Sequence, residues 1–534
     1  MLWPTMQLQE IAALLRPTEV RDMAAGEETI EVTDLVYDSR RTVPGSLFFC
    51  VPGERDDGHA HAAEAVRSGA SAVVCQRPLA VAVPQLLVEG VRAAMNSLAA
   101  PFFGNPSRSL TLAGVTGTNG KTTITYMLDA IFTAAGAATG LIGTVETRLP
   151  GASGTTSQKG VRTTPESVDL QRLLRRMVDA GVSFCAMEVT SIGLSQGRVD
   201  GASFEAALFT NLTQDHLDYH GDLESYYRTK RALFSPGRAA LALVNADDPY
   251  GARLASELRD EGMMALLTFG LDTGADIRAV DVTAAAGGSR FRVAGFGLDQ
   301  TVELRLPGRF NVSNAAAAAA TAAALGAPGA AIAEGLGALP RVPGRFELVD
   351  EGQDFSVVVD YAHTPDSLAR VLSAARELAG PGLPTGGSAG RVIAVFGCGG
   401  DRDRGKRPLM GRAAAAAADL VFVTSDNPRS EPPGAIMAEV ERGIAPRPPV
   451  LGYRLVPDRA EAIAEAIAHA RPGDVVVIAG KGHETTQSFS DRVVDFDDTL
   501  VAGEALRRLA ARRDPVQEPG RAPRSRLAAS DGSR

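Results

Sequence analysis

The sequence has few cysteines and no long apolar segment. Its four cysteines are spread widely among 534 residues and form no Cys-x-x-Cys pair, which argues against a disulfide framework and a structural zinc site. The first residues, Met-Leu-Trp-Pro-Thr-Met, lack the basic start and apolar centre of a secretory signal. No run of about 18 strongly apolar residues follows, as a membrane-spanning helix would require. We therefore expect a soluble cytoplasmic protein without a membrane span.

The chain also lacks an excess of basic residues. It has 54 Lys and Arg against 63 Asp and Glu, and the resulting net charge of -9 argues against a protein that coats nucleic acid. Hydrophobic residues make up 45% and charged residues 22%, an ordinary globular composition that excludes wholesale disorder. At roughly 100–200 residues per domain, the length favours about three domains.

Two segments rich in proline and glycine predict where these domains meet. One covers residues 101–106 and the other residues 340–344, and such segments often mark linkers. We predict an N-terminal domain, a central domain, a C-terminal domain and a tail at residues 1–106, 107–339, 340–513 and 514–534. The tail is rich in Pro, Gly, Arg and Ser and has little apolar surface to bury, so we expect it to be disordered.

Short apolar runs alternate with helical patterns in the central and C-terminal domains. The runs that indicate buried strands lie at 110–115, 184–187, 392–396, 420–423 and 475–479. A helix is predicted from Pro165 to Ala180, with Thr164 as its N-cap, because apolar residues recur there at helical spacing. This alternation predicts an α/β fold with mainly parallel sheets, whose ligands bind at the carboxyl ends of the strands.

A glycine-rich turn follows the first of these strands and opens a helix. Gly117 and Gly120 allow backbone N–H groups to face phosphate oxygens, and the helix N-terminus adds partial positive charge. Lys121 supplies a charge for the β- and γ-phosphates, and Thr122 supplies a hydroxyl for Mg²⁺. The turn is shorter than the usual Gly-x-x-x-x-Gly-Lys-[Ser/Thr] spacing, and a turn without a ligand is the alternative. We favour an ATP site made by Gly117, Thr118, Asn119, Gly120, Lys121, Thr122 and Thr123.

A triphosphate site also needs oxygen ligands for a metal ion. Glu188 directly follows the buried run 184–187, so a strand would deliver its carboxylate to the ligand edge of the sheet. His216 is a candidate second ligand, although an isolated histidine is more often structural.

The order of the motifs resembles that of the Mur ligase family, the ATP-dependent amide-forming ligases of peptidoglycan precursor synthesis. The resemblance extends from about Asp38 to Asp498. Beyond the phosphate turn, it is carried by the segments 38–40, 44–48, 163–166, 187–191, 196–198, 211–220, 306–311, 360–365, 397–407, 426–429 and 480–484. One departure stands at Ile192, where the family often has histidine.

The resemblance implies a fold and an activity. The fold would be α/β in three domains: a smaller N-terminal α/β domain for the UDP end of the substrate, a central P-loop ATPase domain, and a C-terminal Rossmann-like domain for the incoming amino acid. ATP would phosphorylate the D-glutamate carboxylate of UDP-N-acetylmuramoyl-L-alanyl-D-glutamate. The amine of meso-diaminopimelate would then attack the acyl phosphate and release phosphate. The family also implies Mg²⁺ as cofactor, and we expect a monomer.

The resemblance assigns further residues to ligands. Uridine and its diphosphate would lie at Ser39, Glu54, Arg55 and Asp56. The muramoyl-peptide end would lie at Thr163, Thr164, Thr190, Gln196 and Arg198, and the nucleotide would also contact Asn311, Arg345 and Asp360. Lys230 matches a lysine that carbon dioxide carbamylates in the family, which would make the metal ligands Thr122, Glu188, His216 and the carbamate of Lys230. Without that modification, Lys230 between basic neighbours would indicate an exposed basic helix face.

Three loops that follow predicted strands form the expected amino-acid site. Arg429 offers a guanidinium fork for a carboxylate, as Arg402 does, and Glu484 suits an ammonium group. Diaminopimelate carries both groups at its far end, whereas lysine has no distal carboxylate. The expected contacts are Arg402, Asp426, Asn427, Pro428, Arg429, Gly480 and Glu484.

Two alternatives differ from this expectation. The first is another amide ligase of the same superfamily, one that adds D-glutamate, D-alanyl-D-alanine or a folate glutamyl tail; the 426–429 and 38–40 motifs disfavour it. The second is a nucleotide-binding scaffold that has lost catalysis. Retention of Lys121, Thr122, Glu188, His216 and Lys230 argues against the scaffold.

Overall fold

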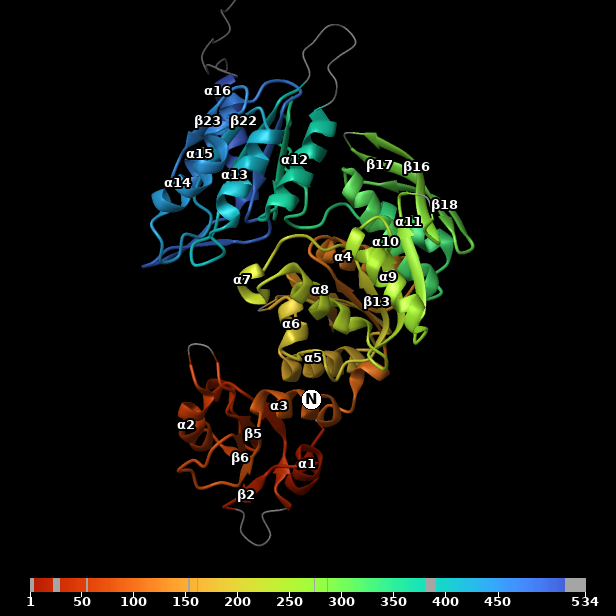
Figure 1. The fold of residues 1–534 in the computed structure, drawn as a ribbon, viewed down its shortest axis with the longest axis vertical. Coiled ribbons are helices and arrows are strands. Elements are labelled where there is room, and N and C mark those ends of the chain that lie inside the picture. Colours follow the sequence, from red (N-terminus) through yellow and green to blue (C-terminus); the bar gives the residue numbers. More distant parts are fainter. Residues whose placement is uncertain are drawn as a thin grey trace, which may run out of the picture.

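A computed structural model describes residues 4–22, 29–53, 56–151, 154–160, 162–272, 274–285, 287–379 and 390–513. The tail 514–534, expected to be disordered, lies outside the described residues. Figure 1 shows three lobes that follow one another along the chain, with the N-terminal lobe at the bottom and the C-terminal lobe at the upper left.

The N-terminal lobe is built on a sheet with the strand order β2-β7-β6-β5-β4. These strands are β2 (Glu19–Arg21), β4 (Asp34–Val36), β5 (Ser46–Phe49), β6 (Ala70–Cys75) and β7 (Gln85–Leu87), and a small pair joins β1 (Met6–Gln7) to β3 (Glu31–Val32). Alternation along β5 sends Leu47 and Phe49 to the core that holds helices α1 (Leu8–Leu15) and α3 (Val91–Phe102). Phe48 points to the opposite core beside α2 (Ala62–Arg67). The sheet is therefore covered on both faces.

The central lobe contains a long sheet with the order β11-β10-β9-β12-β8-β13-β14-β15-β16-β17-β18. Its parallel part consists of β8 (Thr111–Thr116), β9 (Thr139–Ile142), β12 (Phe184–Glu188), β13 (Phe204–Phe209), β14 (Ala239–Asn245), β15 (Ala265–Gly270) and β16 (Ile277–Ala285). Antiparallel strands extend both ends: β10 (Glu146–Gly151), β11 (Gly154–Lys159), β17 (Gly288–Gly295) and β18 (Leu298–Leu304).

Helices cover both faces of the central sheet. One core holds α4 (Lys121–Ala134), α10 (Arg309–Ala324) and α11 (Gly329–Ala338). The alanines at 315–320 are fully buried, since small side chains let α10 approach its neighbours closely. The other face carries α5 (Ser167–Asp179), α6 (Ser191–Ser195), α8 (Leu223–Arg231) and α9 (Pro249–Glu261), and α7 (Leu217–His220) lies next to α8.

The C-terminal lobe has a sheet with the order β19-β20-β24-β21-β22-β23. The parallel strands are β20 (Ser356–Asp360), β21 (Val392–Phe396), β22 (Leu420–Val423), β23 (Tyr453–Leu455) and β24 (Val475–Ala479), and β19 (Glu347–Leu348) is antiparallel. Helices α12 (Pro365–Ala379), α13 (Lys406–Ala417) and α14 (Pro433–Ile444) cover one face, and α15 (Arg459–His469) and α16 (Asp498–Arg513) cover the other. A hairpin of β25 (Thr486–Ser488) and β26 (Val493–Asp495) follows β24.

This architecture confirms the predicted three-domain α/β fold with mainly parallel sheets, and the predicted strands at 392–396, 420–423 and 475–479 coincide with β21, β22 and β24. The helix predicted from Pro165 is wrong at its start, because α5 begins at Ser167 and its N-cap is Glu166. Arg92 and Arg162 each hold the buried Glu166 carboxylate at 2.8 Å, and Glu166 keeps an extended backbone outside the helix.

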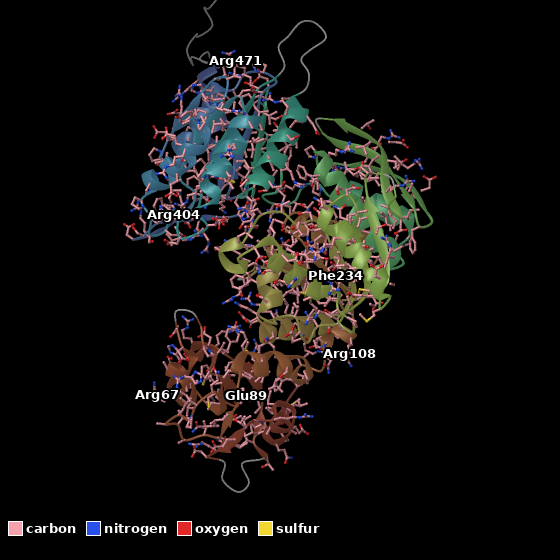
Figure 2. The ribbon with its side chains drawn as sticks, in the orientation of Figure 1. Arg67, Glu89, Arg108, Phe234, Arg404 and Arg471 are labelled. Atoms are coloured by element: carbon pink, nitrogen blue, oxygen red, sulfur yellow. The ribbon has the colours of Figure 1, made fainter. Side chains whose placement is uncertain are left out.

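The carboxyl ends of the C-terminal strands point toward the other lobes. Figure 2 shows Arg404, in the loop after β21, at that end of the domain, whereas Arg471, just before β24, lies at the far end. Loops that follow strands of both large sheets are thus directed toward one region. Within the described part of the chain, no helix is both long and apolar enough to cross a membrane.

Candidate active site

A cavity of about 510 Å³ lies between the central and C-terminal domains. Its lining comes from loops at the carboxyl ends of strands in both sheets and from the starts of helices α4, α10 and α12. The sequence-predicted residues in the lining are Thr118, Asn119, Gly120, Lys121, Thr122, Thr123, Thr163, Thr164, Glu188, Thr190, Arg198, His216, Arg345 and Asp360. The cavity therefore brings the predicted phosphate turn together with most of the predicted muramoyl-peptide contacts.

The phosphate turn depends on its glycines. Gly117 and Gly120 adopt φ of +146° and +89°, values that residues other than glycine rarely adopt. A Cβ atom at Gly117 would collide with the hydroxyl of Thr210. The turn leads directly into α4, so backbone N–H groups at the helix N-terminus face the cavity.

Lys121 lies folded back against its own turn. Its Nζ donates to the carbonyl oxygens of Gly117 and Thr118, each at 2.9 Å. Burial lowers the pKa of Lys121, while the nearby carboxylates of Glu188 and Asp215 act in the opposite direction. An anionic ligand in the cavity would supply the counter-charge that two carbonyl groups provide here.

The unmodified alternative placed Lys230 on an exposed basic helix face, but the side chain is buried. It is 1% exposed, because Tyr226 and Tyr227 turn that side of α8 into the core. Its Nζ donates to the carbonyl oxygen of Gly117 at 2.8 Å and lies 4.6 Å from the ring centre of Tyr226. Burial, and secondarily the charge of Lys121, lower the pKa of Lys230 well below its usual value. This environment favours a neutral, nucleophilic amine.

Glu188 is the last residue of β12 and is 1% exposed. Its Oε1 accepts a hydrogen bond from the N–H of Thr144 at 2.8 Å, and its Oε2 accepts one from the Thr144 hydroxyl at 3.0 Å. The backbone at Gly143 packs so closely that an added Cβ would meet Oε1 at 2.5 Å. The carboxylate is thus held in one orientation at the wall of the cavity.

His216 stands before α7 with a φ of +53°. Its Nε2 lies 3.5 Å from the carboxylate of Asp215. Burial lowers the pKa of His216, and the positive charges of Lys121 and Lys230 add to this effect while Asp215 opposes it. Burial opposes the ionisation of Asp215, yet His363 and His216 lower its pKa. An imidazole and a carboxylate side by side are a donor set that suits a metal ion.

Arg345 connects the C-terminal domain to the phosphate turn. Its Nη2 donates to the hydroxyl of Thr122 at 2.9 Å, and its guanidinium lies 4.6 Å from the ring centre of Tyr361. Asp360, at the end of β20, accepts backbone hydrogen bonds from Phe346 and Ala362, each at 2.7 Å. Burial raises the pKa of Asp360. The structure thus shows Asp360 shaping the cavity wall through the backbone.

Asn311 lies behind the cavity wall. It donates to the carbonyl oxygen of Pro307 at 2.8 Å and accepts from the lining residue Asn314 at 3.3 Å. Asn311 therefore reaches the cavity only through Asn314.

Hydroxyl groups and a guanidinium gather at the other end of the cavity. The Thr164 hydroxyl lies 3.0 Å from the Thr190 hydroxyl and donates to the carbonyl oxygen of Glu188 at 3.0 Å. The hydroxyl groups of Thr163 and Thr144 also lie 3.0 Å apart. Arg198 donates to Gln196 at 2.7 Å and pairs with Glu166 at 3.0 Å. Burial lowers the pKa of Arg198, and its Nε has no hydrogen-bond partner among the described residues.

The residues predicted for the UDP end lie apart from this cavity, in the N-terminal domain. Ser39 donates to Glu64 at 2.6 Å, and the exposed carboxylate of Asp56 lies 2.9 Å from His61. The other two predicted contacts, Glu54 and Arg55, lie outside the described residues.

Two of the predicted amino-acid contacts, Arg402 and Arg429, meet around Gly399. A Cβ atom at Gly399 would come within 2.9 Å of Arg429 and 3.7 Å of Arg402. Arg429, with a φ of +52°, donates to the carbonyl oxygen of Gly400 at 2.7 Å. Burial, with the neighbouring charge of Arg402, lowers the pKa of Arg429. The guanidinium of Arg429 and the stem of Arg402 both lie beside Gly399, and the positive charge of the two side chains would attract an anion.

The remaining loops bring a carboxylate to the same region. Asn427 donates to Glu484 Oε2 at 2.8 Å, and Gly480 bonds to the carbonyl oxygen of Asp360 at 3.0 Å. Burial opposes the ionisation of Glu484, but Lys481 and the amide of Asn427 lower its pKa. Asp426 and Asn427 are both 8% exposed, and Pro428 accepts a backbone hydrogen bond from Glu431 at 3.1 Å.

The sequence reasoning missed several residues of this region. Thr144, Asp215, Asn245, Phe310 and Ser313 line the cavity, and Lys481 lies beneath the amino-acid loops. Asp215 and Lys481 stand inside segments that carried the resemblance, so their position was available as a signal. Phe310 likewise stands inside the segment 306–311, whereas Thr144 had no such signal, because only tertiary contacts bring it to the cavity.

The donor chemistry fits a magnesium ion held together with phosphates. Glu188 and Thr122 supply oxygen atoms, and His216 supplies an imidazole at the cavity wall. Among the described residues, however, no cluster of three or more His, Cys, Asp or Glu side chains would hold a metal unaided. The set is therefore one that needs additional oxygen ligands from phosphate or a modified side chain.

Comparison with known proteins places this geometry in a family. Models of the Mur ligase middle domain, the Mur ligase glutamate ligase domain and the Mur ligase family catalytic domain match residues 115–322, 344–482 and 31–102. A UDP-N-acetylmuramoyl-L-alanyl-D-glutamate–2,6-diaminopimelate ligase from Geobacillus thermodenitrificans is 46% identical over 484 residues, covering 89% of this chain and 95% of the relative. A protein of the same name from Solibacter usitatus is 46% identical over 494 residues, covering 91% and 96%.

Solved structures agree with these matches. A structure of a UDP-N-acetylmuramoyl-L-alanyl-D-glutamate–2,6-diaminopimelate ligase superposes with a TM-score of 0.64 at 32% identity, covering 95% of this chain and 99% of that one. MurF ligase from Thermotoga maritima in complex with ADP shares the fold, with a TM-score of 0.62 at 22% identity, covering 90% and 98%. The chain belongs to the Mur ligase family.

Proposed function

We propose that the protein is an ATP-dependent ligase that joins meso-diaminopimelate to UDP-N-acetylmuramoyl-L-alanyl-D-glutamate in peptidoglycan precursor synthesis. The observation that carries the proposal is that one cavity holds both the phosphate turn and the hydroxyl groups of Thr164 and Thr190. A phosphoryl donor and a carboxylate acceptor bound there would be neighbours. The names of the relatives from Geobacillus thermodenitrificans and Solibacter usitatus support the choice of substrates.

The residues of the chain act mainly by positioning charge. A free carboxylate is a poor acyl donor at neutral pH, and transfer of the γ-phosphoryl group of ATP makes it an acyl phosphate. Lys121 and the N-terminus of α4 would neutralise the phosphates, and Arg345 would add a third positive group from the C-terminal domain. Attack by the amine then forms a tetrahedral centre that collapses to the amide and inorganic phosphate.

The substrate end of the cavity suits an anionic, acceptor-rich ligand. Arg198 is fixed by Glu166 and Gln196, and Thr163, Thr164 and Thr190 offer hydroxyl groups. Ser39 and the 54–56 segment of the N-terminal domain would hold the distant uridine diphosphate.

The amino-acid site explains the choice of nucleophile. Arg402 and Arg429 would bind the distal carboxylate of diaminopimelate, and Glu484 would bind its distal ammonium group. L-Lysine has the ammonium but lacks the carboxylate, so it would form no ion pair with the half-buried Arg429 or with Arg402.

Magnesium would be held by Thr122, Glu188, His216 and a carbamate on Lys230. When bound, the ion would neutralise negative charge on the phosphates. The neutral amine of Lys230 can add to carbon dioxide, with loss of a proton, and the resulting carbamate is an anion with two oxygen atoms. Burial of Lys230 beside Gly117 supports this modification, because it lowers the pKa of the amine and so favours the neutral form that reacts with carbon dioxide.

We further propose that the protein acts as a monomer in the cytoplasm. Its domains would divide at residues 106 and 339, close to the linker helix Pro106–Arg108 and to the end of α11.

The test is phosphate release with a panel of amino acids. Purified protein with ATP and Mg²⁺ should release phosphate only when both the UDP-dipeptide and diaminopimelate are present, and L-lysine should support little turnover. Lys121→Ala should release none, since it lacks the charge that holds the phosphates. Release without either substrate would indicate a generic ATPase, and no release under any condition would indicate a nucleotide-binding scaffold.

A further inference from the structure

Lys481 is a fully buried lysine beneath the amino-acid loops, in the turn that follows β24. Its Nζ lies 3.0 Å from Glu484 Oε2, 3.2 Å from Asn427 Oδ1 and 3.9 Å from Asp426 Oδ1. An ammonium group with 0% side-chain exposure is costly unless charged partners surround it. Its partners here all belong to the loops proposed to bind the incoming amino acid.

Asn427 bonds to both Lys481 and Glu484. Its Nδ2 donates to Glu484 Oε2 at 2.8 Å, and its Oδ1 accepts from Lys481 and from the N–H of Ser488 at 3.0 Å. Both ends of the amide are therefore occupied within the protein. One carboxylate oxygen of Glu484 receives two donors, which fixes the plane of the carboxylate.

Other charged side chains surround Lys481 and Glu484. Asp426 lies 3.9 Å from Lys481 and is itself buried, so removal of the lysine would take away the cation that pairs with Glu484 and also faces Asp426. Arg459 also acts on Asp426 through its charge, but its guanidinium is paired with Asp498 at 2.7 Å and forms no hydrogen bond to Glu484 among the described residues. Lys481 thus joins Asn427, in the loop after β22, to Glu484, in the loop after β24.

We propose that Lys481, acting with Asn427, is a positioning residue that holds the carboxylate of Glu484 oriented to receive the distal ammonium group of the amino-acid substrate. This inference rests on the proposed function, because it assigns that ammonium to Glu484. Lys481 does not touch the substrate. It donates to Glu484 Oε2, and the other carboxylate oxygen, Oε1, is left for the substrate. Asn427, predicted as a direct contact, acts through Glu484 in the same way.

The experiment combines a variant with a substrate analogue. Lys481→Met removes the charge and keeps similar volume, and 2-aminopimelate is diaminopimelate without the distal amine. Lys481→Met should raise the KM for diaminopimelate at least about tenfold, the loss expected for a charge-assisted hydrogen bond. The KM for 2-aminopimelate, ATP and the UDP-dipeptide should stay within about twofold of the wild-type value.

Asp474→Asn is the matched control. Asp474 forms a buried pair with Arg391 at the opposite end of the same sheet, so its loss should lower the melting temperature without a change in substrate preference. If Lys481→Met does not fold, Asn427→Ala tests the same network and should show a smaller rise in KM restricted to diaminopimelate.

The outcomes separate the two proposals. Equal rises in KM for diaminopimelate and 2-aminopimelate, or no rise in a folded variant, would overturn the positioning role while leaving the ligase activity intact. A wild-type protein that does not use diaminopimelate at all would overturn the proposed function instead.

Discussion

The side chains of Lys121 and Lys230 share one hydrogen-bond acceptor: both Nζ atoms donate to the carbonyl oxygen of Gly117, at 2.9 and 2.8 Å. Two protonated amines that donate to one carbonyl oxygen would repel each other. The charge of Lys121 adds to burial in lowering the pKa of Lys230. This arrangement favours one ammonium for the phosphates and one neutral amine for carbamylation.

The first prediction concerns Lys230→Ala. Loss of the carbamate would remove two oxygen atoms from the metal site, so turnover should fall at least a hundredfold. Added acetate or formate should restore part of the activity, because a short carboxylate can occupy the vacated space. Steady-state phosphate release, with and without the added acid, is the measurement.

Lys230→Arg is the companion variant for this prediction. Arginine keeps a cation but does not form a carbamate, and it leaves no space for a carboxylate. Its activity should be low and should not respond to acetate. A fully active Lys230→Ala protein would rule out the carbamate.

The second prediction concerns Arg429. Arg429→Ala should raise the KM for diaminopimelate about 10- to 150-fold, which corresponds to the roughly 1.5–3 kcal/mol of a charge-assisted hydrogen bond. The KM for ATP should not change, since Arg429 does not line the nucleotide cavity. Initial rates over a range of diaminopimelate concentrations provide the measurement.

Arg404→Ala is the control for Arg429. Arg404 follows the same strand as Arg402, is exposed, and pairs with Glu439 (Figure 2). Such pairs contribute little, so this variant should behave like the wild type. An unchanged KM in Arg429→Ala would mean that the carboxylate binds elsewhere.

The sequence predicted those parts of the site that depend on local pattern. The phosphate turn at 117–123 and the position of Glu188 at a strand end follow from glycine spacing and from buried apolar runs, and both are visible within a few residues. The burial of Lys230 could not be predicted from neighbouring residues, because it depends on the packing of Tyr226 and Tyr227 into the central core. The sequence around Lys230 is basic, and local composition alone indicates an exposed helix face.

Contacts between domains also could not be predicted from the sequence. The hydrogen bond from Arg345 to Thr122 joins residues 223 positions apart. The role of Lys481 likewise depends on the meeting of two loops after β22 and β24. Such pairs arise from the strand order of the sheets, which no local pattern encodes.

The third prediction concerns acid stability through His363. Burial lowers the pKa of His363 to about 4, whereas an unfolded histidine titrates near 6.5. Between these values the unfolded chain binds more protons than the folded one, so folding stability falls as the pH decreases. His363→Gln removes that titration and should reduce the loss of stability between pH 7 and pH 4.5 by about 2 kcal/mol.

Urea unfolding of wild type and His363→Gln at the two pH values measures this difference. The comparison isolates His363 because the other titrating groups are common to both proteins. If the two proteins lose the same stability over this range, His363 does not remain neutral in the folded state.

The last prediction concerns the pair formed by Arg459 and Asp498, whose side chains are both 0% exposed and lie 2.7 Å apart. Arg459 also donates to the carbonyl oxygen of Ala479 at 3.0 Å, the residue that precedes the loop of Gly480. Arg459→Met should lower the free energy of unfolding by about 3–5 kcal/mol, since it leaves Asp498 buried without a cation. Replacing both residues together, Arg459→Met with Asp498→Leu, should recover much of that loss, because no unpaired charge remains. Equilibrium urea unfolding of the single and double variants distinguishes the cost of an orphaned charge from the loss of packing, and equal destabilisation in both would assign the effect to packing.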